Sequence, residues 1–218
     1  EEAHLRAASE SSAADKRLEQ LRDGQRERER AVYTLRSRID TLAQTAPEHI
    51  DLGEEFQPLA NFISTKHETA VAAALGAFAE AQAGEVTDSV VESLNNATRT
   101  PLIDIASNAA AQWRLDSDLP STVTWLLDEV VLVPEVQAAV TRLLSDVVLV
   151  PDLSVAREVV REDPRLRAVT PEGLLVGEGW VEAGTGASST VEVSARIAEA
   201  ESQLESATQE LAELSGKI

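Results

Sequence analysis

The sequence predicts an α/β fold in which two similar α/β subdomains are flanked by an antiparallel two-helix coiled coil. Three observations support this. Both ends of the chain repeat apolar residues with a period of seven, the section between them alternates short helix-like and strand-like runs, and that alternation occurs twice. We therefore predict an N-terminal arm over 1–46, a first subdomain over 47–125, a second subdomain over 126–190 and a C-terminal arm over 191–218.

The N-terminal arm has a helix-forming composition, with one glycine and no proline. Its apolar residues alternate spacings of three and four, and Gln25 and Arg28 occupy the same stripe where it turns polar. The predicted seam consists of Leu18, Leu21, Val32, Leu35, Ile39 and Leu42. This pattern indicates a coiled-coil helix.

The C-terminal arm carries a second, more regular stripe. It contains Val193, Ile197, Ala200, Leu204, Ala207, Leu211, Leu214 and Ile218. A helix with one apolar stripe must bury it, and two such helices in one chain are each other's simplest partners, running antiparallel. If 191–218 pairs with 18–45, then 1–17 extends beyond the pair. The alternative is two separate surface helices, which the regular seven-residue repeat disfavours because a straight helix drifts away from it.

The middle section holds all eight prolines and consists of short elements. Its first half is predicted to contain a helix over 67–75, a strand over 77–83, a helix over 87–97 and a strand over 101–105. Gly76 suits the end of the first helix, and Thr87 or Asp88 suits the start of the second. The strand at 101–105 follows from its β-branched residues.

The second half repeats this order about 69 residues later. Pro134 is placed at the first turn of a helix ending near 144, and Asp152 is placed to cap a helix ending near 161. The β-branched runs at 146–150 and 166–170 predict the two strands.

Residues 174–189 are rich in glycine. Gly177, Gly179, Gly184 and Gly186 bracket a short strand over 180–183. Glycine beside a strand often marks the close approach of another backbone. A flexible hairpin and linker into the last helix is the alternative, and the spacing does not separate the two.

Charge and composition exclude several classes of function. The chain of 218 residues has a net charge of −19, of which −15 lies in 47–190, so this section repels a phosphate backbone. It has no cysteine, which rules out disulfides, thiolate metal sites and a zinc hook. The three histidines are scattered and no phosphate-binding glycine loop is present, so we expect no catalytic or metal residues, and an enzyme ranks last. The sequence contains no run of 18 apolar residues, so it predicts no membrane-spanning helix.

Three stretches, at 68–76, 144–160 and 166–181, together with the flanking coils, resemble the hinge of SMC (structural maintenance of chromosomes) proteins, particularly actinobacterial ones. The resemblance covers about 55–195 and depends on the order of the elements rather than on one motif. It implies a homodimer in which sheet edges of two copies pair. The implied contact residues are Gly177, Gly179, Trp180, Val181, Glu182, Ala183, Gly184 and Gly186, with Gly76, Ala77, Phe78 and Ala79 as the opposing edge. The usual Gly-Gly-Ser ending reads Gly184-Thr185-Gly186 here.

The same resemblance implies the wider role. The expected function is the hinge of a chromosome-partitioning or condensation ATPase, joining two arms into a V- or rod-shaped dimer that topologically holds DNA. ATP and Mg²⁺ would bind outside this part of the chain, which is expected to hold no cofactor. The implied partners are a second copy, DNA and kleisin-type subunits, the last of these outside this part. The implied location is the cytoplasm, at the nucleoid.

Two alternatives stay open. Direct DNA contact would use the arm residues Arg22, Arg26, Arg28, Arg30, Arg36 and Arg38. These residues could instead form i,i+4 ion pairs with Glu and Asp of the same helices, so we expect weak, salt-sensitive binding at most. The other alternative to a hinge is a monomeric acidic α/β docking domain inserted in a coiled coil, which would not self-associate.

Overall fold

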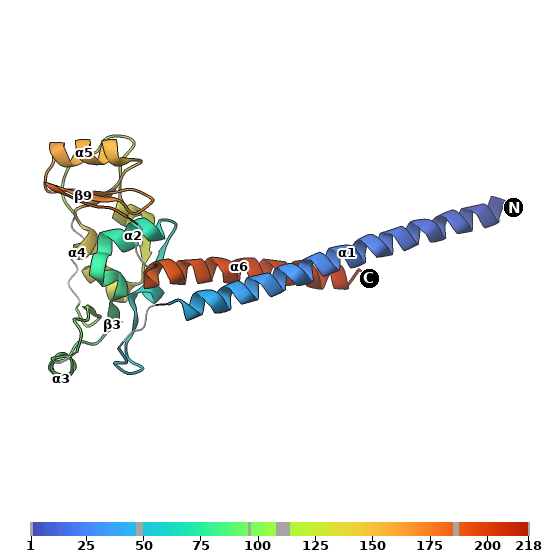
Figure 1. Cartoon of the computed structure of the whole chain (residues 1–218), viewed down its shortest axis with the longest axis horizontal. Coiled ribbons are helices and arrows are strands. Elements are labelled where there is room, and N and C mark those ends of the chain that lie inside the picture. The colour runs from blue at the N-terminus through green and yellow to red at the C-terminus, as the bar shows by residue number, and fades with distance from the viewer. Residues whose placement is uncertain (1, 47–49, 96, 108–113, 185–187, 218) are drawn as a thin grey trace. The chain divides into compact units, whose positions relative to one another are not determined.

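The computed structural model describes residues 2–46, 50–95, 97–107, 114–184 and 188–217. The chain divides into two compact units, Glu1–Thr45 with Arg196–Ile218, and Ala46–Ala195. Figure 1 shows the helices and strands of both units, and each unit is described by itself.

The first unit pairs α1 (Glu2–Gln44) with the part of α6 (Thr190–Ser215) that follows residue 195. Arg28 Nε lies 2.8 Å from Glu210 Oε2, and a Cβ added at Gly24 would lie 3.8 Å from Leu214. From Gly24 to Arg28 the chain moves four residues forward in α1, whereas their partners, Leu214 and Glu210, move four residues back in α6. The two helices run antiparallel, as predicted.

The stripes described above lie between these two helices. In α1, Val32 is buried and Leu18, Leu21, Leu35, Ile39 and Leu42 are half-buried. In α6, Ala200 is buried and Ile197, Leu204, Ala207, Leu211 and Leu214 are half-buried. Val193 is buried too, but it belongs to the second unit, and Ile218 lies outside the described residues. Residues 10–17 of α1 are exposed.

The second unit consists of two halves of similar order. The first half is β1 (Gln57–Pro58), η1 (Leu59–Phe62), β2 (Ile63–Thr65), α2 (Glu68–Leu75), η2 (Gly76–Glu80), β3 (Gln82–Gly84), α3 (Asp88–Ser93) and β4 (Leu102–Asp104). The second half is β5 (Thr124–Trp125), η3 (Leu126–Glu129), β6 (Val130–Leu132), α4 (Pro134–Leu144), β7 (Val147–Leu149), α5 (Leu153–Glu162) and β8 (Arg167–Val169). A hairpin of β9 (Leu175–Gly177) and β10 (Trp180–Glu182) follows the second half only.

Each half has its own sheet. The first sheet has the order β1-β3-β4 and the second has the order β10-β9-β8-β7-β5. In both, the two strands joined through a helix are parallel, β3 with β4 and β7 with β8, and the first strand is antiparallel. The predicted duplication is therefore confirmed, and it extends to elements that the sequence did not predict.

A third ladder joins the halves across an approximate two-fold axis. β2 pairs antiparallel with β6, and Ser64 lies opposite Val131, 67 residues later in the chain. β1, η1 and β2 each begin 67 residues before β5, η3 and β6. Because the central pair, Ser64 with Val131, joins equivalent positions of the two halves, and the outer pairs are related to each other by the same offset, the axis passes through this pair.

Apolar side chains cover both faces of the larger sheet. Successive residues of a strand point to opposite faces, and Val147 belongs to one hydrophobic cluster whereas Val148 belongs to the other. On β8, Val169 belongs to the same cluster as Val147, and Ala168 belongs to the same cluster as Val148. One cluster includes α2 and α4, and the other lies beneath α5. This explains why β7 is apolar at every position and why Ala168 and Val169, successive residues of β8, are both apolar.

Arg167, on β8, joins the ends of two helices. Its guanidinium donates two hydrogen bonds to the Asp146 carboxylate, at 2.7 and 2.8 Å. It also donates to the carbonyl oxygens of Ala74, at the end of α2, and Leu143, at the end of α4, at 3.1 and 2.8 Å. The last carbonyls of a helix lack partners within the helix, so one side chain satisfies an acceptor from each half.

Three predictions about elements need correction. The strand expected over 77–83 is wrong for most of its length, because Gly76–Glu80 form a 3₁₀ helix and β3 begins at Gln82. This run contains no β-branched residue that would favour a strand. The helix expected over 87–97 spans only Asp88–Ser93, and the Thr87 side chain makes no capping bond. The boundary at 125 falls inside the second half, because β5 pairs with β7.

Candidate dimerisation edge

β10 forms one edge of the larger sheet. Its residues pair with β9, as Trp180 with Gly177 and Val181 with Val176, and no strand in the described part of the chain pairs with the other side of β10. All three residues of β10 are exposed, with Trp180 at 43 % and Val181 at 47 % of their full exposure. An apolar edge strand with unpaired backbone groups is a template for another strand.

The backbone groups of Val181 point away from β9. The hairpin has a two-residue turn, so Gly177 and Trp180, which flank it, form its first hydrogen-bonded pair. In an antiparallel ladder, hydrogen-bonded and non-hydrogen-bonded pairs alternate. Val181 and Val176 are therefore a non-bonded pair, and the amide and carbonyl of Val181 face outward.

Two of the predicted contact glycines serve the hairpin itself. A Cβ at Gly177 would lie 2.2 Å from the Trp180 ring, so the absence of a side chain lets this ring lie across β9. Gly179, in the turn, has a φ of +77°, which favours glycine. These positions therefore have reasons within one chain to be glycine.

The remaining predicted contact residues divide by location. Glu182, Ala183 and Gly184 are exposed at the end of the hairpin, and Gly186 lies outside the described residues. The opposing edge proposed at 76–79 is not a strand, because these residues lie in η2, where Ala79 is buried and Phe78 packs against the core. They carry no strand edge that β10 could extend.

The first sheet has an open edge at β4, which the sequence pattern predicts as a strand but does not identify as an edge. β4 pairs with β3 on one side only, and no strand of the described residues pairs with its other side. In the second half, the equivalent strand β8 is covered by β9. The sequence signal was available, because 101–105 was predicted as a strand and only the first half lacks a following hairpin. β4 and β10 are thus the edges that end the two sheets on corresponding sides, and β1 and β5 end them on the other side.

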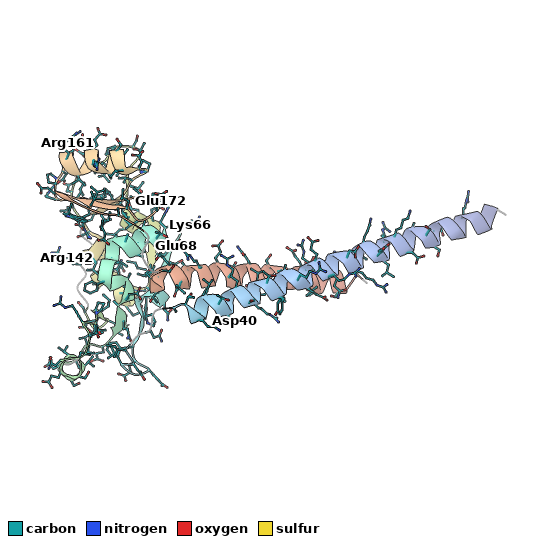
Figure 2. All side chains as sticks on the ribbon, viewed as in Figure 1. Asp40, Lys66, Glu68, Arg142, Arg161 and Glu172 are labelled. Carbon is teal, nitrogen blue, oxygen red and sulfur yellow. The ribbon has the colours of Figure 1, made fainter. Side chains whose placement is uncertain are left out.

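A shallow groove runs beside β10. Its volume is about 430 Å³, and its lining includes Arg157, Val160 and Arg161 of α5 with Val176, Trp180 and Val181 of the hairpin. Figure 2 labels Arg161 on α5. Pro164 also lines the groove, next to an ion pair in which Nη2 of the exposed Arg165 lies 2.7 Å from Oδ2 of the half-buried Asp163. The hydrogen bond from Arg165 holds the pKa of Asp163 well below its ordinary value.

The arginines of the N-terminal arm are all exposed. Arg26 pairs with Asp23 and Arg28 pairs with Glu210 across the coiled coil. Within the described part of the chain, Arg22, Arg30, Arg36 and Arg38 form no ion pair or side-chain hydrogen bond. Ion pairing thus accounts for two of the six candidates for DNA contact.

No group of three or more histidine, cysteine, aspartate or glutamate residues that could hold a metal ion occurs among the described residues. No described helix is long and apolar enough to cross a membrane.

Comparison with known proteins gives one consistent family. Residues 54–160 match the family model described as the SMC proteins flexible hinge domain. Over its whole length, the chain is 35 % identical to the chromosome partition protein Smc of Mycobacterium tuberculosis and 33 % identical to that of Mycolicibacterium paratuberculosis. It spans 20 % of the length of each of these relatives.

Solved structures agree on the fold. An asymmetric dimer of the Geobacillus stearothermophilus SMC hinge domain is similar with a TM-score of 0.74 and 20 % identity, over 94 % of both chains. The Pyrococcus furiosus Smc hinge domain with an extended coiled coil has a TM-score of 0.51 and 21 % identity, over 98 % of this chain and 81 % of that one.

Proposed function

Since this chain belongs to the SMC proteins and carries their hinge domain, we propose that it is the homodimerisation hinge of a chromosome-partitioning ATPase. It would join two coiled-coil arms into a V- or rod-shaped dimer that holds DNA. The observation that carries the proposal is the exposed apolar strand β10, whose unpaired edge includes Trp180 and Val181.

The partner of β10 in this proposal is β4 of a second copy. Both are three-residue edge strands, and the duplication of the two halves makes β4 the counterpart of the covered strand β8. Adding β10 of one copy beside β4 of the other would satisfy the outward backbone groups of both strands. In this proposal the strand edge opposite β10 is formed by Leu102–Asp104 and not by residues 76–79.

Two such contacts form at once when two copies are related by a two-fold axis. Each copy offers one β4 and one β10, so the pairing is reciprocal and closes without leaving a β4 or β10 edge free. Closure makes the second contact intramolecular, and the affinity of the closed ring exceeds that of either contact alone. This is the arrangement needed to hold two arms together with only short strands.

The test is the molar mass of the chain in solution, measured by light scattering over a dilution series. We expect a mass near twice 23.4 kDa, falling toward the single-chain value only on strong dilution. A mass near 23.4 kDa at every concentration would instead favour the monomeric acidic docking domain. The two functions are therefore separated by one experiment.

Weak DNA binding through the arm is a second part of the proposal. Arg22, Arg26 and Arg30 are exposed cations, whereas residues 47–190 have a net charge of −15. Reversing these three charges to glutamate should weaken any DNA binding at least about tenfold and flatten its salt dependence, because each lost phosphate contact removes one counterion-release term.

The matched control for that experiment replaces Lys66 and Arg99, two exposed cations of the other unit, with glutamate. Fluorescence anisotropy of a labelled duplex at several salt concentrations measures both sets. DNA binding that survives the arm reversal unchanged would exclude the arm as its site.

The remaining features belong to the whole protein. We propose that ATP, Mg²⁺ and kleisin-type subunits bind outside this part of the chain, which is not itself an enzyme. The proposed location is the cytoplasm, at the nucleoid.

A further inference from the structure

Helix α3 leaves the apolar side chain of Val91 exposed and that of Val90 only half-buried. It has six residues, none of which is buried, and Val91 is 51 % exposed. Its counterpart in the second half, α5, buries Ala156, Val159 and Val160. A helix of six residues is not stable by itself in water, so α3 is expected to be stabilised by packing against something else.

The groove beside β10 has the right chemistry to receive this helix. It is lined by apolar side chains of α5 and the hairpin, and Arg157 and Arg161 stand one helical turn apart along it. Both arginines are exposed, and within the described residues neither forms an ion pair or a side-chain hydrogen bond. Glu178 is the one acidic residue in the lining.

The exposed face of α3 has the opposite charge. Asp88 and Glu92 stand one turn apart on it, the same spacing as the two arginines, and both are exposed. Their carboxylates make no contact with a cation among the described residues. No lysine or arginine occurs between Lys66 and Arg99, so nothing nearby in sequence offsets this charge.

An antiparallel pairing of β10 with β4 of a second copy would bring α3 and α5 of different copies to the same face of one sheet. β10 runs parallel to β8, because β9 is antiparallel to both. If β10 of one copy runs antiparallel to β4 of the other, a two-fold rotation about an axis perpendicular to the sheet relates the two edges. Such a rotation reverses the strand direction but leaves each face of the sheet on the same side. α3 and α5 each connect two parallel strands, and such crossover connections are right-handed. The two helices therefore lie on the same face of the combined sheet.

The groove also opens on that face. Val181 lies opposite Val176 in the hairpin and therefore shares its side of the sheet, and Val176 packs in the cluster beneath α5. Within one copy, α3 and α5 lie at opposite ends of the second unit (Figure 1), so α3 does not reach the groove of its own chain.

We infer that α3 of a second copy of this chain docks into the groove between α5 and the β9–β10 hairpin, with Asp88 and Glu92 facing Arg157 and Arg161. This inference rests on the proposed function, since it names the contact that would give the dimer its specificity. Exposed ion pairs contribute little singly, but opposite charges across an interface select the partner and its register, and like charges exclude it.

A charge exchange tests the contact. One variant carries Arg157→Glu and Arg161→Glu, and the other carries Asp88→Arg and Glu92→Arg. In each variant alone, both ring contacts bring like charges together, so the dissociation constant of its homodimer should rise about 10- to 100-fold. In a mixture, each ring contact again pairs opposite charges, so heterodimers should form with nearly the affinity of the original chain.

Native mass spectrometry of the mixture, with one variant mass-tagged, measures the populations, and circular dichroism checks that both variants remain folded. Arg36→Glu with Arg38→Glu, a reversal of two exposed arginines on α1, is the control and should leave the dimer unchanged. Unweakened homodimers with a statistical mixture would overturn the inference while leaving the hinge dimer intact. Weakened variants that do not recover on mixing would also overturn it. A monomeric original chain would overturn both proposals.

Discussion

Replacing Arg167 with alanine is expected to lower the free energy of unfolding by about 3 kcal/mol. The substitution removes two hydrogen bonds to Asp146 and one each to the last-turn carbonyls of α2 and α4. The Arg167 and Asp146 side chains are only 26 % and 28 % exposed, so water replaces these partners poorly. Urea denaturation followed by circular dichroism gives the change directly.

Arg165 provides the matched control. It forms a similar pair with Asp163 at 2.7 Å, in which the arginine side chain is 62 % exposed although the Asp163 side chain is only 15 % exposed. We expect Arg165→Ala to cost about 1 kcal/mol or less. Arg167→Lys should fall between the two, because an ammonium keeps the charge but cannot reach two carbonyls and both carboxylate oxygens as a planar fork does. Equal effects at Arg165 and Arg167 would show that joining the two helices adds nothing beyond an ordinary surface pair.

Replacing Val181 with proline is expected to raise the dissociation constant of the dimer roughly 100-fold. Proline has no amide hydrogen, and the amide of Val181 faces away from β9. The isolated chain should tolerate the change, because proline is accepted on an edge strand where the missing N–H faces solvent. In the dimer, one donor is lost at each of two contacts, about 1.4 kcal/mol each.

Val181→Thr is the control, because it keeps the backbone donor and the β-branched shape. It should change the dissociation constant less than about tenfold. Sedimentation velocity over a dilution series measures both variants, and thermal unfolding checks that each is folded. A Val181→Pro dimer as tight as the original would mean that the contact does not use the β10 edge.

Much of the fold followed from local chemistry. Pro134 at the first turn of α4 and the Asp152 side chain, which accepts a hydrogen bond from the Val155 amide at 3.0 Å, start their helices where predicted. The β-branched runs became β7 and β8, and the two heptad stripes lie between the paired helices of the first unit. In each case the residues that set the structure are neighbours in the sequence.

The candidate site could be predicted only in part from residues that are neighbours in the sequence. The hairpin at Trp180 was predicted from its flanking glycines, but β4 was recognised as a strand and not as an edge. Whether a strand is an edge depends on what lies beside it in the sheet, and for β4 this follows from the absence of a counterpart to β9 in the first sheet. The pairing of α3 with the α5 groove likewise requires knowing which face each helix covers.

The sequence by itself determined the coiled-coil arms, helices α2, α4 and α5, strands β4, β7 and β8, and the acidic character of the section between the arms, because periodicity, capping and charge are properties of nearby residues. Only the tertiary structure decided β1, β2, β5 and β6, the 3₁₀ turn at Gly76–Glu80 and the ladder between Ser64 and Val131. Strands of two or three residues have too little local preference to be recognised, and their stability comes from partners that lie far away in the chain.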